Sequence, residues 1–171
     1  SQSAKASSSM GLAWLASSSA GKPQQLAHVT AVLPRAFAIF EAIGKWQPDV
    51  VHMAWGHYPA LVGYLVQNAL PQVATSLSLG AYDLAKEFGG TVRVARRANL
   101  LRTNARCNVP HIAEFCGVPE ERVTVVYTGI DLTRIRTLSE GVERVPFRIA
   151  IAGRLIEGKR VDDALRILAA V

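Results

Sequence analysis

The sequence contains few cysteines, few charges and no long apolar run, and each shortage excludes a class of protein. Two cysteines in 171 residues, Cys107 and Cys116, are too few for a disulfide framework and indicate a reducing compartment. No uninterrupted run of about 18 apolar residues occurs, so we expect no membrane-spanning helix. With 50% hydrophobic and 19% charged residues, the chain can form a sizeable core and is not wholly disordered.

Several nucleotide-binding and catalytic motifs are also missing. The chain has no G-x-x-x-x-G-K-[ST] loop, no G-x-G-x-x-G turn and no G-x-S-x-G nucleophile elbow. The spacing of His, Cys, Asp and Glu gives no pattern for a metal site. We therefore expect neither a metal nor a bound cofactor.

Acidic residues are absent between Glu87 and Glu114, in a chain whose net charge is +6. The arginines in this stretch include Arg93, Arg96 and Arg97, whose spacing of three and four places them on one face of a helix. This face is either simply solvated or a surface for anionic lipid headgroups or an acidic partner. We expect a cytoplasmic protein, with a peripheral position at the inner face of a membrane as one option. Nucleic acid is not expected, because no aromatic residues interleave with the arginines.

Apolar periodicity predicts alternating strands and helices, which favours an α/β fold with a doubly wound parallel sheet. The predicted strands are 50–53, 72–79, 99–103, 122–127 and 147–152. The predicted helices are 26–46, 60–70, 83–88, 91–98, 109–115 and 161–171, with Pro34 as a kink or start of the first.

Ligands of such sheets bind beyond the carboxyl ends of the strands, so residues just after each strand are the candidates for contact. Among the histidines, His57 follows a strand and is the best candidate, whereas we interpret His52 as a core residue and His28 and His111 as surface residues. The other candidates for ligand contact after strands are Gly80, Asp83, Asn104 and Gly129.

The strongest local pattern is IAGRLIEGKR, residues 151–160. Gly153 ends a predicted strand and gives room for close backbone approach, and Arg154 and Lys159 precede a predicted helix. Two cations beside the positive end of a helix are suited to binding a diphosphate. The alternative is a charged loop in solvent.

Three stretches in this order resemble the retaining glycosyltransferases of the GT4 family, which have the GT-B fold of two facing Rossmann-like domains. They are PDVVHMAWGHYPAL (48–61), LLRTNARCNVPHIAEFCGVPEERVTVVYTGIDL (100–132) and IAGRLIEGKRVDDAL (151–165). The second stretch is similar to the end of the amino-terminal domain of that family. The third is similar to the start of its carboxy-terminal domain.

The resemblance implies transfer of a hexose from a nucleotide-sugar to a hydroxyl group of a glycan, lipid-linked or small-molecule acceptor, with retained configuration. Arg154, Lys159 and Gly153 match the positions that bind the donor diphosphate. The chain departs from the family at three positions: Arg160 replaces a usual Gly, Gly80 replaces a usual His, and Thr128 replaces a usual Asn. Gly80 would therefore not supply the sugar contact of that histidine.

The predicted organisation has four parts. Residues 1–25 form a flexible leader or an incomplete start, 26–135 a partial amino-terminal Rossmann-like domain, 136–146 a linker, and 147–171 the first βα unit of a second domain. The glutamate pair of the family would lie beyond Val171, so we expect a fragment with little activity alone. Two other functions stay open: a nucleotide-sugar epimerase of the same architecture, and a non-catalytic module that binds anions or lipid surfaces.

Overall fold

The computed structural model describes residues 9–14, 16, 21–133, 135 and 150–170, which belong to two units. The first unit is Ser1–Gly129 and the second is Ile130–Val171. Within the predicted leader, residues 9–14 are helical and the side chain of Trp14 is buried. The predicted linker, 136–146, lies outside the described residues.

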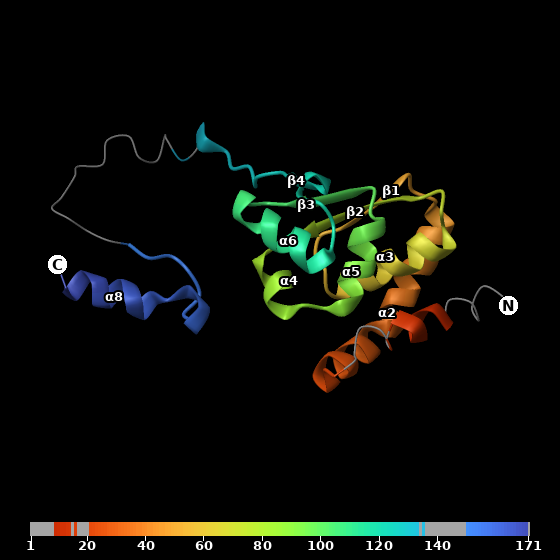
Figure 1. The fold of residues 1–171 in the computed structure, drawn as a ribbon, viewed down its shortest axis with the longest axis horizontal. Coiled ribbons are helices and arrows are strands. Elements are labelled where there is room, and N and C mark those ends of the chain that lie inside the picture. The colour runs from red at the N-terminus through yellow and green to blue at the C-terminus, as the bar shows by residue number, and fades with distance from the viewer. Residues whose placement is uncertain (1–8, 15, 17–20, 134, 136–149, 171) are drawn as a thin grey trace. The chain divides into compact units, whose positions relative to one another are not determined.

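The first unit is an α/β fold around a four-stranded, all-parallel sheet with strand order β1-β2-β3-β4, a Rossmann-like arrangement (Figure 1). In register, Met53 pairs with Leu77, and Leu79 pairs with Thr103. The strands lie within the ranges predicted for them: β1 (Val50–Met53), β2 (Ala74–Leu79), β3 (Leu100–Thr103) and β4 (Val123–Val125).

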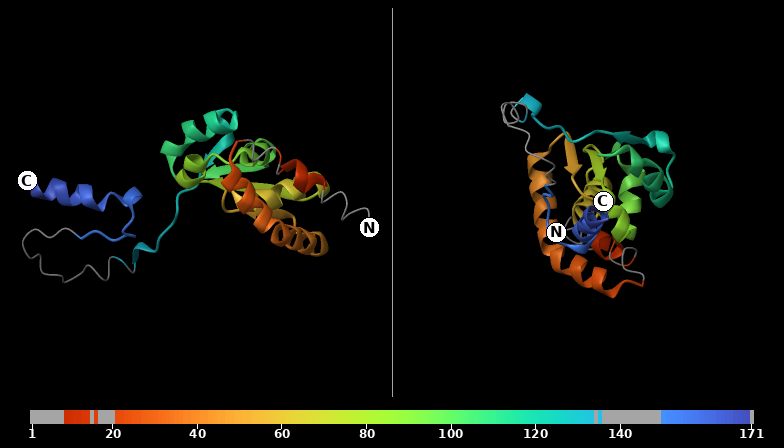
Figure 2. Two further views of the ribbon diagram at one scale, coloured as in Figure 1. Left: turned by 90° about the horizontal axis from the view of Figure 1, so that it is seen from below. Right: turned by 90° about the vertical axis from the view of Figure 1, so that its left-hand side faces the viewer.

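Helices connect the strands, as parallel pairing requires, and the main ones lie on one face of the sheet. Because the strand order follows the chain order, right-handed crossovers place α3, α5 and α6 on the same side (Figure 2). The helix α2 packs beside α3. The helices are α2 (Pro23–Trp46), α3 (Tyr58–Ala69), α4 (Ala81–Lys86), α5 (Gly89–Arg97) and α6 (Val109–Cys116).

The core lies between these helices and the sheet. Leu77 and Leu101 point from the strands into it and are at most 1% exposed. Leu65 of α3, Val94 of α5 and Ile112 of α6 meet them with no exposed surface. The helix α3 is buried nearly all round, as its uniformly apolar sequence predicts.

The opposite face of the sheet is more exposed to solvent. Val50 and Leu100 are exposed there, and Arg102 is half-buried. The doubly wound expectation requires helices on both faces, whereas the described helices between the strands occupy one face only. His52 also lies on the opposite face and is exposed, with Nδ1 3.0 Å from the Ser76 hydroxyl, so the prediction of a core histidine is wrong.

The helix α2 begins three residues before the predicted start and runs through Pro34 without ending. Its residues Val29, Ala36, Phe40 and Ile43 are buried. By length and composition this 24-residue helix is also apolar enough to cross a membrane, because alanines extend its apolar character between the few charges. The expectation that the chain has no membrane-spanning helix was based only on the absence of a long uninterrupted apolar run. Core helices and signal sequences meet the same criterion, so α2 alone assigns no location.

The second unit contains the short 3-10 helix η3 (Glu157–Lys159) and α8 (Val161–Ala169), which confirms the predicted last helix. Of the predicted strand 147–152, residues 147–149 lie outside the described part and Ala150–Ala152 do not form a strand. No described residue of this unit is fully buried. Arg166 pairs with Asp162 and Asp163 along α8, and Arg160 pairs with Asp163.

Candidate functional site

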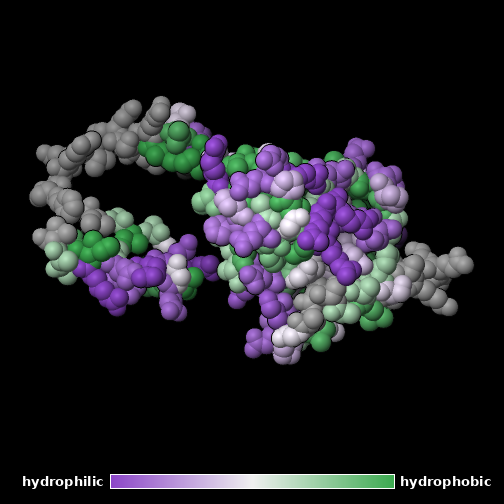
Figure 3. All heavy atoms as spheres, viewed as in Figure 1, coloured by the Kyte–Doolittle hydropathy of each residue, from purple (hydrophilic) through white to green (hydrophobic). Residues whose placement is uncertain are grey.

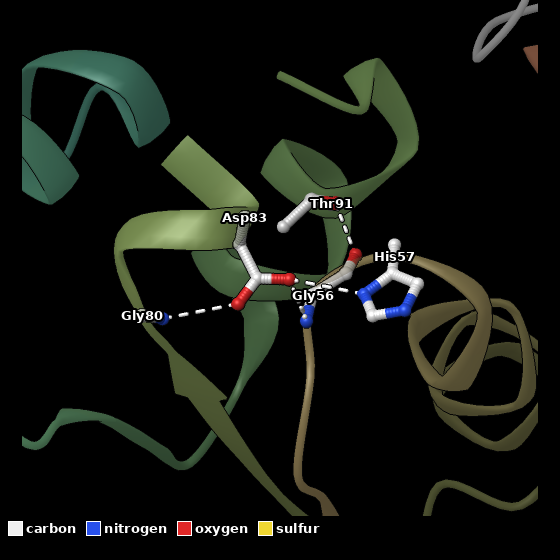
Figure 4. Close-up of polar contacts among 5 residues, drawn as sticks. All are labelled: Gly56, His57, Gly80, Asp83 and Thr91. Atoms are coloured by element: carbon white, nitrogen blue, oxygen red, sulfur yellow. Dashed lines mark hydrogen bonds and ion pairs between the residues drawn. The ribbon is translucent and has the colours of Figure 1, made fainter. Parts of the chain in front are cut away.

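Two polar segments meet where β1 and β2 end. The strands are parallel neighbours, so the loop after Met53 and the loop after Leu79 lie at the same edge of the sheet. The first loop supplies Gly56 and His57, and the second supplies Gly80 and Asp83. Figure 4 shows Asp83 lying between the two loops.

The carboxylate of Asp83 connects the two loops by hydrogen bonds. Its Oδ1 accepts the backbone N–H of Gly56 at 2.8 Å and lies 3.2 Å from Nδ1 of His57. Its Oδ2 accepts the backbone N–H of Gly80 at 3.0 Å, at the start of α4. The Asp83 side chain is 1% exposed, so this buried charge is stabilised by its hydrogen-bond donors and holds both loops in place.

Gly56 is required by close packing. A Cβ atom at this position would collide with the side chains of Leu79 and Thr91. The hydroxyl of Thr91, at the start of α5, donates a hydrogen bond to the Gly56 carbonyl oxygen. Both backbone polar groups of Gly56 are therefore bonded to buried side chains, which fixes the direction of the following residue, His57.

His57 lies among aromatic rings. Its ring centroid is 5.0 Å from that of Tyr58, 5.5 Å from Tyr82 and 5.7 Å from Trp55. Trp55 and Tyr82 are about half exposed, at 48% and 51%, and their rings meet edge to face. The edge of the sheet thus presents a histidine, 17% exposed, between two accessible aromatic side chains.

This arrangement can bind a hydroxyl-bearing ligand. The tautomer of His57 that donates from Nδ1 to the Asp83 carboxylate has a lone pair on Nε2. That nitrogen is able to accept a hydrogen bond, or a proton, from a ligand hydroxyl. Burial raises the pKa of the neighbouring Tyr58 hydroxyl, and the charge of Tyr82 raises it further, so Tyr58 stays protonated at neutral pH.

The predicted site residues of the first unit fall into two groups. The structure brings together His57, Gly80 and Asp83. Asn104 and Gly129 are exposed after β3 and β4, and neither has a hydrogen bond to the Asp83 group among the described residues. The sequence analysis missed Thr91 and Phe88. The ring centroid of Phe88 lies 5.8 Å from that of His57, and the only local signal of Phe88 was its position directly before the two glycines that begin α5.

Gly153, Arg154 and Lys159 belong to the second unit and are exposed there. Lys159 ends η3, and Arg154 lies five residues earlier, so both precede α8 as predicted. Arg160, the residue before α8, has φ of 50°, a left-handed conformation that favours glycine.

The arginines and cysteines are also placed. Arg93, Arg96 and Arg97 are exposed on one face of α5, as their spacing predicts, and the structure adds that they line one pocket. Cys107 is exposed and Cys116 is buried. Burial raises the pKa of the Cys116 thiol to about 11, against a smaller lowering by Arg96, so this thiol is protonated and unreactive at neutral pH.

No model of a protein family, no curated protein and no solved structure matches this chain. Functional inference for this chain therefore depends on its own residues and geometry.

Proposed function

We propose that the chain is part of a retaining glycosyltransferase of the two-domain GT-B type, which transfers a hexose from a nucleotide-sugar to a hydroxyl acceptor. The observation that carries the proposal is the His57–Asp83 pair at the carboxyl ends of two parallel strands. This edge of the sheet has an imidazole lone pair beside accessible aromatic rings, which is suited to binding a polyhydroxylated substrate.

The acceptor is assigned to the first unit. Nε2 of His57 accepts a hydrogen bond from an acceptor hydroxyl, and Asp83 fixes the imidazole tautomer and orientation. The backbone around Gly56 and Gly80 is held by the same carboxylate, so the site is rigid before a ligand binds. Such pre-organisation reduces the entropy lost on binding.

The donor diphosphate is assigned to the second unit. Arg154 and Lys159 would stabilise the negative charge that develops on the leaving diphosphate. The backbone of Arg160 supports this assignment, because it adopts the glycine-like conformation at the position where the resembled family has glycine. The local chain can therefore keep that loop shape even with arginine.

Isothermal titration calorimetry with UDP, GDP and ADP tests the donor assignment. We expect at least one diphosphate to bind the wild type, and Arg154→Ala and Lys159→Ala each to weaken that binding about tenfold, roughly the value of one charge-assisted hydrogen bond. Arg166→Ala is the matched control, because it removes the same charge from an exposed position within the same unit. Equal affinity of all four proteins, or no binding, would contradict the proposal.

A further inference from the structure

A second group of polar residues lies at the other end of the first unit. The last turns of α5 and the second half of α3 enclose an open pocket of about 320 Å³, lined by Tyr64, Asn68, Arg93, Arg96 and Arg97. Figure 3 shows a strongly hydrophilic surface over α5. These helix ends lead into the amino ends of β2 and β3, whereas His57 lies at the carboxyl ends.

Two of the three arginines are held in place by main-chain carbonyls. Nε of Arg96 donates to the Cys116 carbonyl oxygen at 2.6 Å, at the end of α6. Nη2 of Arg97 donates to the Gln67 carbonyl oxygen at 2.7 Å, and its Nη1 donates to Asn68 Oδ1 at 2.9 Å. A cation at the carboxyl end of a helix is favourable, so these two contacts stabilise α6 and α3.

Gly117 lets Arg96 approach the end of α6. Its φ is 61°, and a Cβ atom there would collide with the Arg96 guanidinium. The two guanidinium groups are thereby fixed, yet each keeps further N–H donors, because a guanidinium has five. Their entropy is already lost in the folded protein, so a ligand would not have to immobilise them.

The positive charges of this pocket are not balanced by carboxylates of the described residues. Apart from the His57–Asp83 contact, the ion pairs among the described residues involve Arg160 and Arg166, and none of the three pocket arginines has a described carboxylate within 4.0 Å. Helix capping accounts for Arg96 and Arg97. It does not account for Arg93, which is exposed and has no hydrogen bond to another described residue. An anion in the pocket would relieve the repulsion among the three charges.

We infer that this pocket binds a phosphate group. Guanidinium groups bind phosphate oxygens in pairs of parallel hydrogen bonds, which favours phosphate over a simple halide ion. Tyr64 and Asn68 complete the lining of the pocket. The phosphate is either that of a soluble phosphomonoester or the headgroup of an anionic lipid. The pocket is built from residues of the first unit, whereas the diphosphate site proposed above is built from residues of the second.

The test compares four versions of the 171-residue chain: the wild type, Arg93→Ala, Arg93→Lys and Arg35→Ala. Arg93→Ala removes the pocket arginine that has no hydrogen bond or ion pair to another described residue, so the fold should persist, which circular dichroism checks. Arg35→Ala is the charge-matched control, since Arg35 is exposed on α2 and outside this pocket. Binding is measured to inorganic phosphate by NMR titration, and to phosphatidylcholine vesicles with or without phosphatidic acid by flotation.

We expect saturable binding to phosphate, to the phosphatidic acid vesicles, or to both, and the two probes distinguish a soluble from a lipid ligand. Arg93→Ala should weaken the binding at least tenfold, Arg93→Lys by less, and Arg35→Ala by no more than twofold. Absence of binding to both probes would overturn the inference. Equal weakening by Arg93→Ala and Arg35→Ala would also overturn it, because it would indicate attraction by net charge only.

Discussion

The two units of the chain are stabilised by different interactions. In the first unit, Leu77 and Leu101 are at most 1% exposed, and helices from three separate segments pack against them. In the second, Leu165 is 61% exposed and Ile167 is 66% exposed, while Arg166 pairs with acids along the helix surface. Burial of apolar side chains is therefore the main stabilising interaction in the first unit. In the described part of the second unit, the main interactions are ion pairs between residues close together in the sequence.

This difference matters for the two candidate ligand sites. His57 is positioned by a buried carboxylate, so changes around it alter both the site and the stability of the unit. Arg154 and Lys159 are exposed, so their removal should alter ligand binding while leaving the fold unchanged. The following experiments test that contrast, and they run from the largest expected effect to the smallest.

Leu77→Ala should produce the largest change. Removing a fully buried leucine side chain leaves a cavity, and we expect a loss of about 3 kcal/mol in the free energy of unfolding. Leu165→Ala, the matched change in α8, should cost less than about 0.5 kcal/mol because this side chain is exposed. Urea unfolding followed by circular dichroism measures both. Equal losses would show that the two units do not differ in this way.

Asp83→Ala should destabilise the first unit by about 2 kcal/mol, because it leaves the buried N–H of Gly56 and the N–H of Gly80 without an acceptor. Asp83→Asn keeps one oxygen acceptor and should cost less. Amide NMR spectra would show shifts at Gly56 and Gly80 in both variants. Unchanged stability of Asp83→Ala would mean that water replaces the carboxylate and that the site is not held from within.

The Cys116 thiol should make stability depend on pH above 9. Its ordinary pKa of 9.0 rises to about 11 in the folded protein, so between these values the folded state holds a proton that the unfolded state has lost. Unfolding is then favoured as pH rises, by about 1 kcal/mol at pH 10.

Cys116→Val is the control for this pH dependence, because valine fills a similar buried volume without a titrating group. Burial also raises the pKa of Tyr58, which adds its own pH dependence at alkaline pH, so the informative quantity is the difference between the pH profiles of the wild type and Cys116→Val. Identical slopes for wild type and Cys116→Val from pH 8 to 10.5 would contradict the assignment to Cys116.

Arg166→Ala should have the smallest effect, because its pairs with Asp162 and Asp163 lie in solvent. Exposed pairs of this spacing contribute about 0.3–0.5 kcal/mol to helix stability, and 1 M salt should remove the difference between variant and wild type. The Cα chemical shifts of residues 161–169 report the helix content of α8. A complete loss of helix would show that α8 depends on this one side chain.

Much of the fold follows from local patterns. Alternation and apolar spacing predicted β1 to β4 and the helices between them, because these periods reflect the stereochemistry of neighbouring residues. The ranges erred at the ends: α2 begins at Pro23, since proline is well tolerated in a first helical turn. Pro34 did not stop the helix, because buried side chains on both sides of it pack into the core.

The candidate site was only partly predictable. His57, Gly80 and Asp83 were singled out because each follows a strand, and the structure brings them together. The role of Thr91 had no local signal, since it depends on how α5 packs against the loop at Gly56. His52 was assigned to the core from its apolar neighbours, but strand alternation places it on the face opposite the helices.

The sequence by itself determined the succession of strands and helices, the polar residues that follow each strand, and the acid-free arginine stretch. Only the tertiary structure decided that Asp83 would reach back 26 residues to His57, and that Arg96 and Arg97 would cap neighbouring helices while Arg93 has no hydrogen bond to another described residue. The reason is physical: periodicity is fixed by short-range backbone geometry, whereas contacts between distant residues depend on which surfaces pack together and exclude water.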